Sequence, residues 1–169
     1  MSSRLLSSTL LVALLTMDTW PSGAAAGSDF PRVVLHAPRG QQRIGALGTG
    51  RWGAPGECPP GVHLDFLEPP RRPVKVRTGK PMFIRFHKAE QPSTVELLGP
   101  RGRPIPFSLN PYDPDGTVVA WDAGFRAPRS GRRLYGIGTD ARWPDENCPG
   151  FHQGAVWNFL VERRGERQT

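Results

Sequence analysis

Residues 74–86 read VKVRTGKPMFIRF and contain two runs in which apolar and polar side chains alternate. Val74 and Val76 alternate with Lys75 and Arg77, and the same period of two continues after Pro81. This period is typical of a strand with one buried face, and the TGKP sequence between the runs is typical of a tight turn. The stretch therefore predicts a β-hairpin.

The composition of the whole chain agrees with a β-rich fold. Of the 169 residues, 20 are Gly and 19 are Pro. Pro costs about 3 kcal/mol and Gly about 1 kcal/mol inside a helix, so this content disfavours an all-α protein. Hydrophobic residues make up 37% of the chain and include five Trp and eight Phe, which favours a packed core over disorder. The length fits one domain.

Short alternating runs bounded by Gly, Pro or Asp recur along the chain. We predict strands at residues 32–36, 62–67, 74–78, 82–87, 94–98, 105–109, 117–122, 134–138 and 155–162. Strands at this spacing are typical of an all-β antiparallel sandwich or barrel. Two polar segments rich in Gly or Pro, 45–61 and 140–154, are predicted to be long loops.

Three segments resemble secreted immunoglobulin-like sandwiches: VKVRTGKPMFIRF at 74–86, TVELLGPRGRPIPF at 94–107 and LYGI at 134–137. The resemblance covers about residues 62–163 and implies an antiparallel Greek-key sandwich. The Cys-Trp-Cys spacing of immunoglobulin domains is not present. Because fold does not carry function, this resemblance implies no particular ligand.

The N-terminal 26 residues have the pattern of a secretory signal peptide. A short positive segment with Arg4 precedes the apolar run LLSSTLLVALL at 5–15, and AAA at 24–26 fits a cleavage site. We expect a secreted protein that begins near Gly27 and does not span the membrane. Residues 27–61 would then form an N-terminal strand and a long loop, 62–163 the body of the same domain, and 164–169 a charged tail.

The two predicted loops repeat one pattern. Arg-Trp, a spacer, Cys-Pro, Gly, an apolar residue and His occur around Trp52, Cys58 and His63, and again around Trp143, Cys148 and His152. Two cysteines in an exported chain predict one disulfide, Cys58–Cys148, which would hold both loops at one end of the sandwich. We expect Trp52 and Trp143 to lie around this bridge and to be exposed as contact residues, because Trp is enriched at binding hot spots.

An alternative is a metal site in the same loops. Cys148, His152, Cys58 and His63 offer two thiolates and two imidazoles, which is a ligand set for zinc. The sequence CPGFHQGA at 148–155 also resembles the copper loop of cupredoxins, which implies Cys148 and His152 as copper ligands. No Met follows His152 at the axial position. If the two cysteines form a disulfide, this site is lost.

The net charge of +7 includes a cluster of cations along one predicted hairpin. The basic stripe consists of Arg71, Arg72, Lys75, Arg77, Lys80, Arg85, His87 and Lys88. It predicts contact with an anionic cell-surface polymer or with a protein partner, and the alternative is a solvated sheet face. No aromatic platform for nucleic acid accompanies these charges. We therefore expect a non-enzymatic binding module with no cofactor. Copper or zinc binding is the second hypothesis.

A hydrolase is the third hypothesis. His63 and Asp65 would share one face of a strand, but this spacing is more typical of a surface pair than of a catalytic dyad. The sequence contains no motif of a nucleophilic enzyme, and we predict no catalytic residue.

Overall fold

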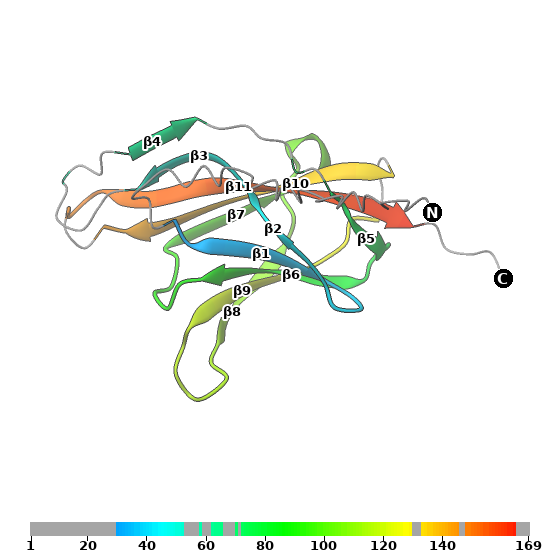
Figure 1. Ribbon diagram of the computed structural model, residues 1–169, viewed down its shortest axis with the longest axis horizontal. Coiled ribbons are helices and arrows are strands. Elements are labelled where there is room, and N and C mark those ends of the chain that lie inside the picture. The colour runs from blue at the N-terminus through cyan, green and yellow to red at the C-terminus, as the bar shows by residue number, and fades with distance from the viewer. Residues whose placement is uncertain are drawn as a thin grey trace, which may run out of the picture.

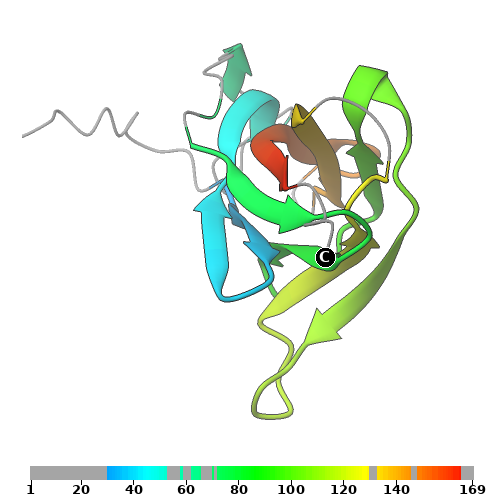
Figure 2. The same cartoon turned by 90° about the vertical axis from the view of Figure 1, so that its right-hand side faces the viewer.

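The computed structural model describes residues 30–52, 58, 62–65, 70, 72–129, 133–145 and 148–164, with the backbone alone at 62–65. This part of the chain is almost entirely β-structure in two sheets (Figure 1, Figure 2). Sheet A contains β1 (Arg32–Ala37), β2 (Gln41–Ile44), β6 (Pro81–His87), β8 (Phe107–Tyr112) and β9 (Ala120–Arg126). Sheet B contains β3 (Ala46–Trp52), β4 (Val62–Asp65), β5 (Val74–Arg77), β7 (Thr94–Leu98), β10 (Leu134–Pro144) and β11 (His152–Arg164). A short 3-10 turn, η1 (Pro100–Gly102), follows β7.

The strand orders place β6 at the centre of sheet A and β11 at the centre of sheet B. The orders are β2-β1-β6-β9-β8 and β4-β3-β11-β10-β7. All the pairings along these orders are antiparallel. The all-β prediction is therefore confirmed. A sandwich is consistent with these two sheets, while Greek-key connectivity and the immunoglobulin-like or cupredoxin-like topology stay predictions.

The alternation in the sequence correctly predicts which side chains face the core. In β5 the buried Val74 and Val76 alternate with the exposed Lys75 and Arg77. Along β10 every second side chain from Tyr135 to Trp143 is buried. The core lies between the inner faces of the two sheets, and its most buried large side chains include Trp143, Phe86, Phe159, Leu35 and Ile84.

The hairpin predicted for residues 74–86 is wrong in its pairing. β5 pairs in parallel with the end of β11, whereas β6 pairs with β1 and β9 in the other sheet. The turn at Gly79 (φ 68°) thus carries the chain from sheet B to sheet A, and Gly79 N–H donates to the Ala127 carbonyl. Alternation decides which face of a strand is buried, but it does not decide which strand lies beside it.

The two predicted loops also contain strands in their described parts. β3 runs through the first of them, and β10 and β11 continue through the second as a paired hairpin that reaches Pro144 and His152. Glycines explain the error for β3, because here they make room for packing rather than for turns. A Cβ on Gly50 would lie 2.5 Å from the Ala155 Cβ, and one on Gly45 would lie 2.8 Å from Phe159 Cζ.

Smaller differences concern the strand ends. The strand predicted at 105–109 is β8, two residues later, and that at 117–122 is β9, three residues later. β2 was not predicted at all, so the described part of residues 27–61 contains three strands rather than one. The turn at Gly116 joins β8 and β9 as an antiparallel hairpin, and its loop projects beyond the sheets (Figure 1, Figure 2).

Candidate functional site

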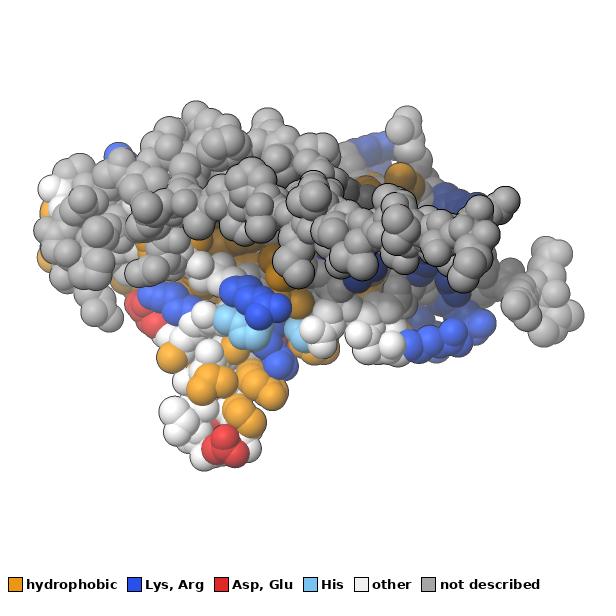
Figure 3. Space-filling view, in the orientation of Figure 1, with side chains coloured by type: hydrophobic (Ala, Val, Ile, Leu, Met, Phe, Trp, Pro, Cys, Tyr) orange, Lys and Arg blue, Asp and Glu red, His pale blue; other side chains and the backbone are white. Residues whose placement is uncertain are grey.

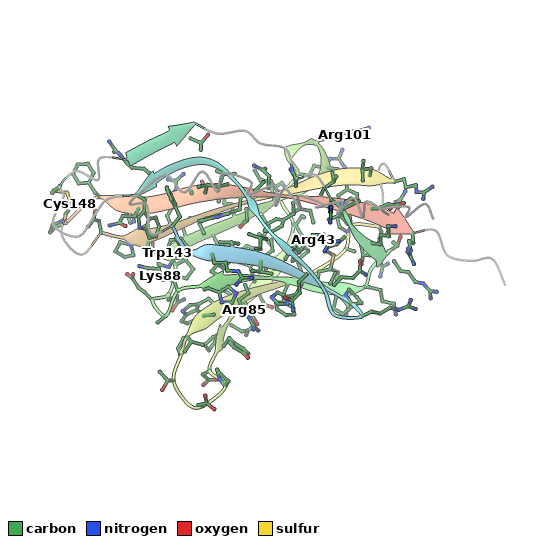
Figure 4. The ribbon with its side chains drawn as sticks, in the orientation of Figure 1. Arg43, Arg85, Lys88, Arg101, Trp143 and Cys148 are labelled. Carbon is green, nitrogen blue, oxygen red and sulfur yellow. A yellow bond between two sulfur atoms is a disulfide. The ribbon has the colours of Figure 1, made fainter. Side chains whose placement is uncertain are left out.

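The predicted disulfide is present. Cys58 and Cys148 are bonded with their Cα atoms 5.2 Å apart, and they are 90 residues apart in the sequence. Cys148 is buried in the turn between β10 and β11, where its N–H donates to the Asp145 carbonyl and its carbonyl accepts from Phe151 N–H. The bridge fixes residue 58 to this turn (Figure 4).

The disulfide removes the thiolates on which the predicted metal site depends. In this oxidised protein neither Cys58 nor Cys148 can ligate copper or zinc, because the thiolate is the ligand form. His152 is exposed with its Nδ1 3.4 Å from Ser93 Oγ, and the side chain of His63 lies outside the described residues. Within the described part of the chain, no group of three or more His, Cys, Asp and Glu is arranged to hold a metal. Copper or zinc binding through Cys58 and Cys148 would need the reduced protein.

The prediction that Trp52 and Trp143 are exposed contact residues is wrong. Their relative exposures are 6% and 0%. Because β3 and β10 are strands rather than loops, both rings point into the core, with centroids 5.8 Å apart in an edge-to-face contact. The Trp143 indole N–H donates to the Glu90 carbonyl at 3.0 Å. These rings stabilise the fold and are not available to a partner.

Arg85 does not belong to the basic stripe with which it was predicted. Its Nε and Nη2 each donate to an Asp122 carboxylate oxygen at 2.7 Å. The guanidinium lies 3.4 Å from the centre of the Tyr112 ring, which covers it. The Asp122 bonds raise the pKa of Arg85, and only 15% of its side chain is exposed. Its charge is thus already paired on the outer face of sheet A, in the other sheet from β5.

Two histidines share this outer face. The His36 ring is stacked on Phe83 with centroids 4.4 Å apart. Burial lowers the pKa of His36, and the nearby Arg85 lowers it further. Burial and Arg32 also lower the pKa of His87. The outer face of sheet A therefore disfavours additional positive charge.

Two cations of the stripe on β5, Lys75 and Arg77, meet others around a hollow of about 680 Å³ at the β5 end of the molecule. We call this the basic hollow. Its charged lining residues are Arg39, Lys75, Arg77, Lys80 and Arg164. No acidic residue is among the described residues that line it. Figure 3 shows Lys and Arg side chains gathered at this end of the molecule.

Three segments distant in sequence form the basic hollow, and Gln41 links two of them. The Gln41 side-chain oxygen accepts a hydrogen bond from Lys75 N–H, and its amide nitrogen donates to the Lys75 carbonyl, both at 2.9 Å. The amide thereby imitates a strand partner for β5 and joins β2 in sheet A to β5 in sheet B. Arg164 completes the rim from the end of β11.

Sequence reasoning thus found Lys75, Arg77 and Lys80, which are exposed, but missed Arg39 and Arg164. Arg72 is exposed but does not line the hollow, and Arg71 lies outside the described residues. The missed signal was the Pro38–Gly40 turn sequence, because a hairpin there would have brought Arg39 towards β5. Nothing local indicated Arg164, since its position depends on the parallel pairing of β5 with β11.

No protein-family model, curated protein or solved structure matches the chain. Among the described residues there is no helix with the length and apolar character needed to cross a membrane. The argument for function therefore starts from the geometry of the basic hollow.

Proposed function

We propose that the protein is a non-enzymatic binding module that acts outside the cytoplasm and binds an anionic polymer through the basic hollow. The observation that carries the proposal is that five cationic side chains, from β5, β11 and two turns, line one hollow without an acidic lining residue. Such an arrangement focuses positive potential and attracts polyanions.

The make-up of the basic hollow suits repeated anionic groups. Three of its cations are Arg, whose planar guanidinium can donate two parallel hydrogen bonds to a carboxylate, sulfate or phosphate. Among the described residues, the one ion pair that involves these side chains joins Lys75 to Glu162 at 4.0 Å, and Glu162 is held more closely by Arg133 at 2.6 Å. A polyanion would relieve the mutual repulsion of cations that are left largely unpaired in the free protein.

The backbone at Arg39 supports a binding role. Arg39 has φ 67°, a left-handed conformation that costs an L-residue other than Gly, Asn or Asp about 1–2 kcal/mol. Strained residues of this kind cluster at binding sites, where the side chain is required despite its backbone cost. Arg39 is exposed and lines the basic hollow.

The setting is supported by two independent features. The N-terminal sequence predicts a secretory signal peptide, and the Cys58–Cys148 disulfide is typical of proteins in oxidising compartments. A polymer that carries carboxylates, sulfates or phosphates on the outside of a cell is therefore the proposed ligand class.

Heparin, a sulfated polysaccharide, provides a direct probe. The Lys75→Gln/Arg77→Gln variant should elute from immobilised heparin at lower NaCl than the parent protein. Its affinity should also depend less steeply on salt, because fewer counterions are released on binding. The matched control Arg32→Gln/Arg43→Gln removes the same charge from exposed sites elsewhere in sheet A.

The control separates a site from general charge. The proposal is overturned if the parent protein fails to bind heparin at low salt, or if the control weakens binding as much as the variant of the basic hollow does.

A further inference from the structure

A second hollow lies beside the turn that follows β7, and it differs in chemistry from the basic hollow. Its volume is about 370 Å³, within the usual range of small-molecule sites. Its walls include the rings of Pro100, Pro104, Pro106 and Pro128, together with Ile105. We call it the proline pocket.

The charged side chains of the proline pocket are donors only. Arg101, Arg103 and Arg126 line it, and no acidic side chain is among its described lining residues. Proline has no N–H, so four of the wall residues offer no backbone donor. The three guanidinium groups are therefore the main donors of the pocket, and they suit a ligand that presents an apolar surface to the walls and an acceptor-only group, such as a carboxylate, to the arginines.

The turn that carries two of these arginines is fixed before any ligand arrives. Gly99 N–H donates to the Arg103 carbonyl at 2.8 Å, and Gly102 N–H donates to the Gly99 carbonyl at 3.1 Å. Ile105 N–H donates to the Leu97 carbonyl at 2.8 Å, which anchors the pocket floor to β7. A preformed pocket loses little conformational entropy on binding.

The backbone at Arg101 is strained within this turn. Arg101 has φ 63°, although Gly102 directly after it is also left-handed at φ 68°. Arg101 lies at the tip of the turn, where Figure 4 shows its side chain exposed. Across the pocket Arg126 is held by a hydrogen bond from its Nη1 to the Gly79 carbonyl at 3.2 Å. Cations thus flank the apolar wall from two separate segments.

We infer that the proline pocket binds a small carboxylic acid with an apolar body of about the size of one or two rings. The apolar body packs against the proline rings and Ile105, and the carboxylate accepts hydrogen bonds from Arg101 and Arg103. This inference does not depend on the polyanion site, because the two hollows share no lining residue.

Calorimetric titration with 2-naphthoate, 2-naphthylmethanol and acetate tests the inference. The three probes separate the apolar body from the charge. We expect saturable binding of 2-naphthoate at one site, and at least about tenfold weaker binding of the other two, because each lacks one of the two interactions.

The variant Arg101→Gln/Arg103→Gln should lower the affinity for 2-naphthoate at least about tenfold, whereas Arg32→Gln/Arg43→Gln should not. Both arginines of the pocket variant are exposed, and unchanged near-ultraviolet circular dichroism would verify its fold. Lys75→Gln/Arg77→Gln should bind 2-naphthoate normally, so failure at one hollow is distinguishable from failure at the other. The inference is wrong if 2-naphthoate does not saturate at millimolar concentration, if the alcohol binds equally well, or if the control loses as much affinity.

Discussion

Trp and Arg are both residue types that are enriched at binding hot spots, but they lie in opposite environments at the two ends of β11. Near its start, at His152, the disulfide and the two core tryptophans lie close to the β10–β11 turn. At its other end, 12 residues and about 40 Å further on, Arg164 lies on the rim of the basic hollow. At the first end the rings of Trp52 and Trp143 are buried in the core, and at the second end the cationic side chains are exposed to solvent. A residue type that is enriched at binding hot spots therefore indicates a contact surface only when its side chain points outward from the sheet.

The largest expected effect tests the first end. Trp143→Ala should reduce the free energy of unfolding by about 3–5 kcal/mol, because it leaves a cavity at a fully buried site. Arg77→Ala, at the other end, should change it by no more than about 0.5 kcal/mol. Urea denaturation measures both. Similar losses for the two variants would contradict the contrast between the ends.

A smaller effect tests why the residues near the Cys58–Cys148 disulfide form strands rather than the predicted loops. Gly154→Ala should cost about 1–3 kcal/mol, since its Cβ would lie 2.5 Å from the Ala141 carbonyl oxygen and force the backbone to shift. Gly136→Ala is a matched control in the same hairpin, where the nearest heavy atom would be 3.9 Å away. Thermal unfolding of the two variants should separate them clearly, and equal melting temperatures would refute the proposed role of Gly154.

These positions show how far the sequence could predict the fold. Alternation correctly identified the buried faces of β5 and β6, because burial imposes a period of two on a strand. It failed at Gly50 and Gly154, where a missing side chain makes room for a neighbouring strand but resembles a turn signal in the sequence. The pairing of β5 was not predictable in the same way, since its partner lies about 90 residues away.

The candidate site was predictable only in part for the same reason. Lys75 and Arg77 are on one strand, so their spacing revealed a shared face. Arg39 and Arg164 reach the same hollow only through the Gln41 link and the parallel pairing of β5 with β11. Side chains brought together by tertiary contacts leave no local pattern.

The outer face of sheet A provides a test by pH. The folded protein holds the pKa of His36 below its ordinary value, so below about pH 6.5 the unfolded chain takes up the proton more readily. The free energy of unfolding should therefore fall as the pH decreases from 7.5 to 5.5. His36→Phe should keep the stacking on Phe83 and make this fall less steep. A parallel pH profile for the variant would show that His36 is not one of the groups responsible.

The smallest expected effect separates stability from binding at the basic end. Arg39→Asn should raise the free energy of unfolding by up to about 1 kcal/mol, because Asn tolerates the left-handed backbone, and it should weaken heparin binding. Arg43→Asn, on the extended strand β2, should bring no such gain. If Arg39→Asn lowers stability, or leaves heparin affinity unchanged, the strain at Arg39 does not serve binding.

The central position of β11 has a consequence for how the molecule is made. A chain that emerges from its N-terminus can pair all five strands of sheet A before β11 has been synthesised. Sheet B cannot do so, because β3, β5 and β10 all pair directly with β11, the last of the described strands. Until β11 arrives, those three strands present unpaired edges to their surroundings, and such edges promote aggregation. The nascent protein is therefore most vulnerable just before β11 is synthesised, when a chaperone that masks β edges would help it most.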